Sequence, residues 1–282
     1  MPESILTPHV ATDGVNLAIQ DWLLERGTQP RAGVLIVHGL GEHAGRYEEM
    51  AEHLCSWGFQ VRGYDHYGHG ESGGARGVIS SNSRLEEDLA DVVEQTRSRL
   101  PRGLPLILIG HSMGGLVAAH AVAFGRVQVE GLVLSSPALD PGLTAFQRFL
   151  LAVLPVVAPD LRVHNGLNAK WISHDPRVVQ AYRADRLVHD RISARLARYI
   201  HEAGMEVRAA AVRWTVPTLL LYAGADRLVS PGGSAEFAAA APRGLVESQA
   251  YPDMFHEIFN ELGRNEVYAR LKLWLDQRFP AT

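Results

Sequence analysis

The sequence of 282 residues is poor in several features that would each point to a particular class of protein. It has one cysteine, Cys55, which excludes an intrachain disulfide framework and fits a reducing compartment. It has no run of about 20 apolar residues, so no helix is expected to span a membrane. Lys and Arg (27) do not outnumber Asp and Glu (31). We therefore expect no nucleic-acid partner, because such a partner requires a basic face.

The first ten residues also lack a targeting signal. They contain prolines and a glutamate instead of a basic stretch followed by an apolar one. We expect a cytoplasmic location and leave peripheral contact with a membrane open. The sequence makes no prediction of oligomeric state.

What the sequence does contain is a regular alternation of apolar runs and helical patterns. The runs, typical of strands buried on both faces, lie at 34–37, 59–64, 106–109, 131–134, 218–222 and, more weakly, 245–247. Helical patterns such as 47–57 and 85–100 lie between most of them. The alternation predicts an α/β fold with a mostly parallel central sheet flanked by helices, preceded by a hairpin that turns at Asp13-Gly14. Such sheets bind ligands at the carboxyl ends of their strands.

Residues 137–211 interrupt this alternation, because they contain no strand-like run. The apolar stretch 146–157 and the helical spacing over 192–203 predict helices instead. We expect Pro155 and Pro159 to break the first of these helices. We interpret 137–211 as a helical cap over the strand ends, inserted into a single-domain core formed by 1–136 and 212–282.

The most specific motif is Gly-x-Ser-x-Gly at 110–114, directly after an apolar run. Strand, sharp turn and helix would place the Ser112 hydroxyl at the tip of the turn, where it is the candidate nucleophile. A second match, at 70–74, contains Ser72. No apolar strand runs into it and no amphipathic helix follows, so we interpret Ser72 as a loop residue.

A serine nucleophile requires a histidine base and a carboxylate that orients this base. In folds of this kind the acid and then the histidine follow the serine along the chain. Asp226 lies in the turn after a predicted strand, and His256 is the only histidine that follows it. Asp140 is the competing acid, whereas Asp253 and Glu257 are too close to His256 to come from a separate strand end.

Two backbone N–H groups are the expected donors of an oxyanion hole. The N–H of Met113 follows the nucleophile at the start of a helix, where amides have no intrahelical partner. The glycine-containing turn 38–43 follows an apolar run, and the N–H of Leu40 is its expected donor. The histidine pairs 38/43 and 66/69 lack the spacing of a metal-binding helix, so we expect no metal.

Three stretches together resemble the monoacylglycerol lipase/lysophospholipase branch of the α/β-hydrolases. They are His-Gly-Leu-Gly-Glu-His-Ala-Gly-Arg-Tyr at 38–47, Asp-His-Tyr-Gly-His-Gly-Glu-Ser at 65–72 and Gly-His-Ser-Met-Gly-Gly at 110–115. The settings of Asp226 and His256 are similar as well. The chain departs from the family at Asp253-Met254-Phe255, where members often have a Leu or a second His just before the catalytic histidine.

The resemblance implies a serine carboxylester hydrolase acting on monoacylglycerols or related lipid esters through an acyl-enzyme. It implies Ser112, Asp226 and His256 as the triad, Leu40 and Met113 as oxyanion donors, and no metal or organic cofactor. Two alternatives stay open. One is a hydrolase-fold protein that binds a small molecule without turnover. The other is a triad enzyme that cleaves thioester, amide or carbon–carbon bonds.

Four apolar residues of the predicted cap are candidates for an acyl-chain pocket above the serine: Phe146, Phe149, Leu150 and Val153. Pockets for lipids are mostly apolar, with a few polar groups near the chemistry. Packing of this surface onto the core is the alternative. We also expect its outer part to make transient contact with membranes or micelles.

Overall fold

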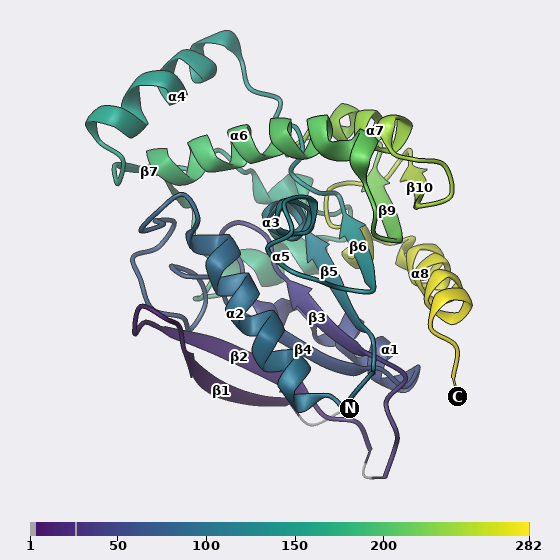
Figure 1. Cartoon of the computed structure of the whole chain (residues 1–282). Helices are drawn as coiled ribbons and strands as arrows, with labels where there is room; N and C mark the ends of the chain where they lie inside the picture. Colours follow the sequence, from purple (N-terminus) through teal and green to yellow (C-terminus); the bar gives the residue numbers. More distant parts are fainter. Residues whose placement is uncertain (1–3, 26, 282) are drawn as a thin grey trace.

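A central sheet of eight strands organises the molecule (Figure 1). The computed structural model describes residues 4–25 and 27–281. The spatial order of the strands is β1 (Ser4–Val10), β2 (Asn16–Trp22), β4 (Gln60–Tyr64), β3 (Gly33–Val37), β5 (Leu106–His111), β6 (Gly131–Ser135), β9 (Thr218–Ala223) and β10 (Val246–Tyr251). Pairing is antiparallel for β1–β2 and β2–β4 and parallel from β4 to β10. The prediction of a mostly parallel α/β sheet with an N-terminal hairpin is confirmed.

Helices cover both faces of the sheet, because its central strands are apolar on both sides. Along β3, Leu35 and Val37 pack on one face, and Val34 and Ile36 on the other. The first face meets α2 (Arg84–Arg99), α3 (Ser112–Ala123), α6 (Ala194–Ala210) and α7 (Pro231–Ala240). The second meets α1 (Glu48–Ser56) and α8 (Arg264–Arg278). A strand buried on both faces has no polar alternation, which explains the continuous apolar runs.

The segment 137–211 contributes no strand to the central sheet within the described residues. It consists of α4 (Ala145–Val157), β7 (Arg162–His164), the 3-10 helix η2 (Ala169–Trp171), α5 (Pro176–Ala184), β8 (Arg191–Ser193) and α6. Figure 1 shows α4 and α6 above the ends of the central strands. Three further 3-10 helices are η1 (Ala44–Tyr47), η3 (Ala211–Arg213) and η4 (Ile258–Asn260).

Two expectations for this segment are wrong. First, β7 and β8 pair with each other antiparallel, although no strand was expected there. Each is three residues long, too short for a periodic pattern, and only their pairing over a long separation makes them strands. Second, α4 continues through Pro155 and ends at Val157. Pro155 lies in the last turn, and the helix ends two residues later, where Ala158 N–H donates to Leu154 O (2.8 Å).

Candidate active site

Ser112 lies at a sharp turn between β5 and α3. Its φ of +52° is in the left-handed region, which is rare for a residue with a side chain and costs backbone strain. Gly114 makes the turn possible, since a Cβ there would overlap the carbonyl oxygens of Val37 and His38. A Cβ on Gly110 would lie 2.6 Å from Gly115 Cα. The motif therefore presses the start of α3 against the end of β3 and presents the serine at the strand ends.

Asp226 and His256 are joined by a short hydrogen bond in the interior. His256 Nδ1 lies 2.6 Å from Asp226 Oδ2, and both side chains are buried. Two backbone N–H groups, of Leu228 (2.8 Å) and Val229 (3.1 Å), also hold Asp226 through Oδ1. This bond uses Nδ1 and leaves Nε2 as the ring nitrogen available to a serine proton. Asp226 and His256 come together from loops that follow β9 and β10.

Charge sets the ionisation of this pair. Burial alone would lower the pKa of His256, but the Asp226 carboxylate outweighs burial and raises that pKa above its usual value. Burial would raise the pKa of Asp226, and contact with His256 together with its hydrogen bonds lowers it instead. The pair thus favours an ionised acid beside a histidine that gains a proton readily.

Asp140, the competing acid, has a different environment. Its Oδ1 accepts a hydrogen bond from Gly142 N–H (3.0 Å), and its backbone carbonyl accepts one from Ser230 N–H (2.9 Å). Its carboxylate caps a local turn and makes no recorded contact with His256 among the described residues. Ser72 also has a structural environment. Its buried hydroxyl donates to Asp65 O (2.6 Å) and accepts from Ala18 N–H (2.8 Å).

The residues of the two predicted oxyanion donors line the same cavity as Ser112. Met113 N–H belongs to the first turn of α3, and Leu40 lies in the turn after β3. That turn is fixed by Glu42, whose Oε1 accepts the N–H of Gly39 at 2.6 Å. In the described part of the chain, neither the Leu40 nor the Met113 N–H has a recorded acceptor. Both amides are therefore free to donate to a ligand.

A buried ion network beneath this turn was not predicted. Arg46 donates to both carboxylate oxygens of Glu257 at 2.8 Å and also contacts Glu42. Tyr47 O–H donates to Glu42 (2.7 Å). Burial would raise the pKa of Glu42 and of Glu257, but Arg46 outweighs it and lowers both. Arg46 and Glu257 are 211 residues apart, and no local pattern in the sequence links them.

Two cavities meet at the serine. The larger, of about 430 Å³, is mostly apolar and is lined largely by residues of segment 137–211. Its lining includes Ser112, Met113, Leu40 and His256 and, from the cap, Leu150, Leu151, Leu154, Leu161, Val163, Ile192 and Ile200. The smaller, of about 20 Å³, also reaches Ser112, Leu40 and His256, and its wall combines the charged Glu42, Arg46 and Glu257 with apolar side chains. Ser112 thus lines a large apolar cavity and a small one that contains charged groups.

The predicted pocket residues separate on the two sides of α4. Leu150 lines the large cavity. Phe149 and Val153 are 62% and 41% exposed and are not among the lining residues, so they do not form its wall as predicted. The reason is rotation of the helix, which turns these two positions outward. The side chain of Phe146 lies outside the described residues. Leu151 and Leu154 take the place of the outward-facing pair.

The glycine-turn histidines pack together away from the cavity. His38 Nε2 accepts a hydrogen bond from His66 N–H (2.9 Å), and the two rings lie 4.5 Å apart. Burial lowers the pKa of His38 to about 3, so it is neutral at physiological pH. Among the described residues, no group of three or more His, Cys, Asp or Glu side chains is arranged to hold a metal ion.

Comparison with known proteins shows the family of the chain. Residues 28–263 match the Hydrolase_4 family, described as serine aminopeptidase, S33. A monoacylglycerol lipase of Mycolicibacterium smegmatis is 34% identical over 266 residues, 93% of each chain. The human monoglyceride lipase is 33% identical over 278 residues, which cover 96% of this chain and 90% of that one.

Solved structures agree with this placement. The crystal structure of Paleococcus ferrophilus monoacylglycerol lipase superposes with a TM-score of 0.83 at 32% identity, covering 94% of this chain and 99% of the other. Within residues 4–25 and 27–281, no helix combines the length and the apolarity needed to cross a membrane. The chain belongs to the Hydrolase_4 family of α/β-hydrolases, in the branch that contains the monoacylglycerol lipases.

Proposed function

We propose that the protein is a serine carboxylester hydrolase that cleaves monoacylglycerols through an acyl-enzyme intermediate. The observation that carries the proposal is the 2.6 Å hydrogen bond between His256 and Asp226, together with the cavity that both His256 and Ser112 line. Two relatives support the choice of substrate: a monoacylglycerol lipase at 34% identity and a monoglyceride lipase at 33%.

The proposed reaction begins at the Ser112 hydroxyl. His256 Nε2 accepts its proton while the oxygen attacks the ester carbonyl, and Asp226 stabilises the imidazolium that forms. The N–H groups of Met113 and Leu40 donate to the oxyanion. His256 then returns the proton to the leaving glycerol oxygen. A water molecule, deprotonated by the same histidine, releases the fatty acid from Ser112.

The two cavities suggest how the substrate lies. An acyl chain matches the large apolar cavity, whose wall Leu150, Leu151 and Leu154 supply from the cap. The small cavity, of about 20 Å³, has room for a water molecule beside Arg46, Tyr182 and Glu257 but not for a glycerol group. Ser112 lines both cavities, so the ester bond of a substrate whose chain fills the large one would lie where the two meet.

We further propose that 137–211 acts as a cap on the core and that its outer side touches lipid surfaces. The cap supplies most of the large cavity and also holds the catalytic histidine loop. Glu257 N–H donates to Ile172 O (2.8 Å), and His256 N–H to Trp171 O (3.4 Å). A membrane contact through the cap would bring this cavity toward the lipid that it hydrolyses.

Two measurements test the proposed function. Fluorophosphonate labelling should modify Ser112 in the wild type and fail in Ser112→Ala. Release of glycerol from a monoacylglycerol should then exceed hydrolysis of aminoacyl amides, the substrates that the family description suggests. Absence of labelling would favour a binding protein without turnover. Faster cleavage of the amides would overturn the assignment to esters.

A further inference from the structure

Phe255, just before His256, stands where the chain departs from the family, and its ring lies in a cluster of stacked groups. It stacks on the ring of His174, with 3.6 Å between the ring centres and 19° between the planes. It also meets the Trp171 ring edge to face, with 5.2 Å between the centres. Phe255 belongs to the loop after β10, whereas Trp171 and His174 belong to the cap. The departure from the family therefore creates a contact between the cap and the neighbour of His256.

Arg227, just after Asp226, joins the same cluster from the other loop. Its guanidinium carbon lies 3.8 Å from the centre of the Trp171 ring and 6.0 Å from that of Phe255. Arg227 is exposed, and in the described part of the chain it has no recorded carboxylate partner. A guanidinium over a tryptophan face is attracted by the negative face of the ring. Trp171 thus contacts both the residue after Asp226 and the residue before His256.

One buried carboxylate holds the remaining side of this cluster. Glu261 accepts the N–H groups of Phe255 (2.8 Å) and His174 (3.2 Å) and contacts His174 Nδ1 (2.8 Å). The two stacked rings therefore cannot separate without loss of hydrogen bonds to a buried carboxylate. The backbone adds a further contact, since His256 N–H donates to Trp171 O (3.4 Å). We call the group formed by Trp171, His174, Arg227 and Phe255 the clasp.

The clasp begins where the backbone contact between the two loops ends. The last hydrogen bond between their backbones among the described residues runs from Ala225 N–H to Met254 O (3.2 Å). Asp226 and His256 lie beyond it and contact each other through their side chains, at 2.6 Å. Misplacement of a reacting group by about 1 Å costs on the order of 10² in rate. The clasp continues the contact between the loops through the neighbours of this pair.

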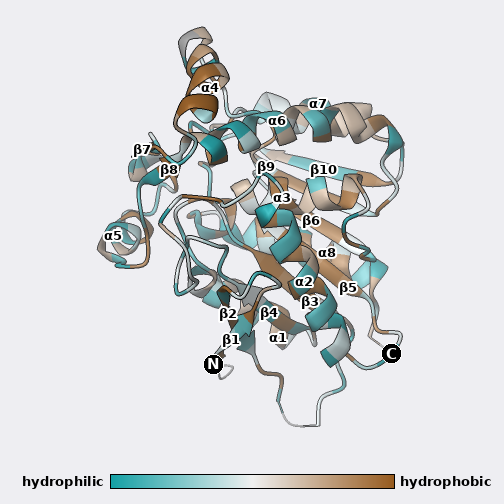
Figure 2. Cartoon of the chain, turned by 60° about the vertical axis from the view of Figure 1, so that its left-hand side comes forward, coloured by the Kyte–Doolittle hydropathy of each residue, from teal (hydrophilic) through white to brown (hydrophobic). Residues whose placement is uncertain are grey.

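We infer that Trp171 is a positioning residue that keeps Asp226 in contact with His256. It acts through the neighbours of these two residues, Arg227 and Phe255. The inference rests on the proposed function, in which that contact serves the catalytic base. Trp171 is in η2, between β7 and α5 in the chain, and Figure 2 shows β7 and α5 standing apart from the sheet. Trp171 is not among the lining residues of either cavity, so it acts on the chemistry without touching the substrate.

The pH dependence of catalysis reports on this contact. Burial alone would lower the pKa of His256, and Asp226 raises that pKa above its usual value. The other titratable groups recorded beside His256 are Glu257, Glu42 and His111, whose ring lies 4.7 Å away, and none of them belongs to the clasp. A looser contact with Asp226 lowers the pKa of His256. In a variant without the clasp, kcat/KM should therefore persist to a lower pH than in the wild type.

Trp171→Leu removes the aromatic face and tests the inference with nitrophenyl acetate, whose short acyl group does not depend on the large cavity. We expect kcat to fall about tenfold. KM should hardly change, because His256 serves both the formation and the hydrolysis of the acyl-enzyme. The fall of kcat/KM with pH should move to lower pH. Trp171→Phe keeps an aromatic face and should restore most of both. Arg227→Gln should cause a smaller loss and a shift in the same direction.

Proton NMR supplies a second measurement, which does not depend on turnover. The signal of the His256 Nδ1 proton is the far-downfield signal that Asp226→Asn abolishes. In Trp171→Leu this signal should move upfield, because the hydrogen bond to Asp226 lengthens. Trp171→Phe should return it toward the wild-type position.

Trp57→Leu is the matched control for the loss of a tryptophan. Trp57 is half-buried, with its ring 5.7 Å from that of His53 and 5.8 Å from Lys272 Nζ, so its removal breaks contacts of the same kind. It lies just before β4 begins, at the opposite edge of the parallel sheet from Ser112. Trp57→Leu should lower the melting temperature and leave the pH profile and the NMR signal unchanged.

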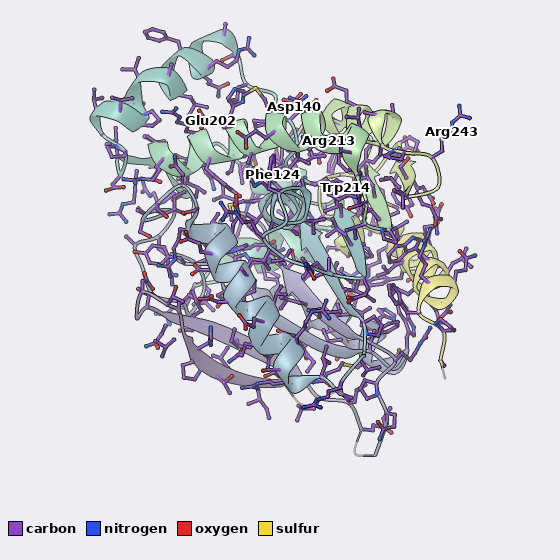
Figure 3. The ribbon with its side chains drawn as sticks, viewed as in Figure 1. Phe124, Asp140, Glu202, Arg213, Trp214 and Arg243 are labelled. Atoms are coloured by element: carbon purple, nitrogen blue, oxygen red, sulfur yellow. The ribbon has the colours of Figure 1, made fainter. Side chains whose placement is uncertain are left out.

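Arg243→Gln is the matched control for Arg227→Gln. Arg243 is exposed and has no recorded carboxylate partner among the described residues, and Figure 3 shows it at the right-hand edge of the molecule. Its removal should leave kcat and the pH profile unchanged. If Trp171→Leu does not fold, Arg227→Gln carries the same test, because its side chain is exposed.

Three results would overturn the inference. They are a wild-type pH profile in Trp171→Leu, a profile at higher pH in Arg227→Gln, and equal losses of kcat in Trp171→Leu and Trp57→Leu. The second would show that Arg227 acts by its charge alone, since removal of a nearby cation raises the pKa of a histidine. An active wild type with none of the expected shifts in the variants refutes only the positioning role. A wild type that hydrolyses no ester, although its NMR signal responds as expected, refutes the proposed function.

Discussion

The core and the cap are held in place by different kinds of contact. Every residue of β3, β5 and β6 is buried, so burial from both faces fixes their positions. In the cap, α4 has no fully buried residue among those described. Outside α6, segment 137–211 is tied to the rest of the chain mainly by hydrogen bonds and aromatic contacts, such as His189 N–H to Gly41 O (2.9 Å), Ser193 N–H to Gly77 O (2.7 Å) and the stacking of His174 on Phe255.

The weakly packed region nevertheless reaches the groups that would do the chemistry. The His189 bond ends on the turn that carries Leu40, and the Trp171 and Ile172 carbonyls hold the loop of His256. Asp185 of the cap also contacts His43 (2.8 Å). If Ser112, Asp226 and His256 form the triad as proposed, the buried core holds the reacting groups and segment 137–211 supplies most of the wall of the large cavity.

The comparison predicts that chemistry depends on the core, most strongly on Ser112. Ser112→Ala should lower kcat for ester hydrolysis by about 10⁶, the cost of losing the nucleophile in a comparable triad. The melting temperature should not fall, because the substitution removes only a half-buried hydroxyl from a strained turn. Ser72→Ala is the control and should retain near-full kcat. An inactive Ser72→Ala beside an active Ser112→Ala would show that the nucleophile has been misplaced.

Substitution of the acid, Asp226, should cause the second largest loss of kcat. Asp226→Asn should lower kcat by about 10⁴, because the base loses its orientation and the partner for its charge. Asp140→Asn, which removes only a turn cap, should have a far smaller effect, and equal losses in the two would contradict the assignment.

The pH profile sharpens the same prediction. Since Asp226 raises the pKa of His256, wild-type kcat/KM should fall as the pH drops through a value above about 6.5, the ordinary pKa of histidine. In Asp226→Asn, the carboxylate that raises the pKa of His256 most is gone, and only the weaker effects of Glu257 and Glu42 oppose burial. The residual activity should therefore persist to lower pH. If kcat/KM of Asp226→Asn fell at the same pH as that of the wild type, or at a higher one, Asp226 would not be the group that raises the pKa of His256.

The free energy of unfolding should depend strongly on residues buried in the core and hardly at all on the exposed side chains of α4. Leu132 is fully buried in β6, and Leu132→Ala should lower the free energy of unfolding by about 2–5 kcal/mol. Val156→Ala on α4 should change it by less than about 0.5 kcal/mol. Denaturant unfolding of both variants measures the difference. Equal losses would mean that α4 packs against the body of the protein more tightly than its exposure indicates.

The same contrast explains what could be predicted from the sequence. The strand 106–109 and the elbow at Ser112 are local, since a buried strand and a tight turn each require particular residue types next to one another. Asp226 and His256 are not local, but their order along the chain fixes them once the serine is known. The geometry places them together as that order requires.

Other features depend on contacts between distant parts of the chain, or on which side of a helix faces the core, and neither can be read from neighbouring residues in the sequence. Arg46 meets Glu257, and β7 meets β8, only after distant parts of the chain have folded. The apolar helix α4 gives no sign in its sequence of which side faces the cavity. Phe149 and Leu150 are adjacent and equally apolar, yet one faces outward and the other lines the cavity.

The smallest expected effect tests this division between the two sides of α4. Leu154 lines the large cavity, so Leu154→Asn should raise KM for long-chain nitrophenyl esters about tenfold and hardly change KM for the acetate. Phe149→Asn places the same polar group on the outer side and should produce no dependence on chain length. Leu273→Asn, on an exposed position of α8, controls for the loss of a surface leucine. A KM that rises equally for all esters in Leu154→Asn, with a lower melting temperature, would mean that Leu154 supports the fold of the cap and does not select the acyl chain.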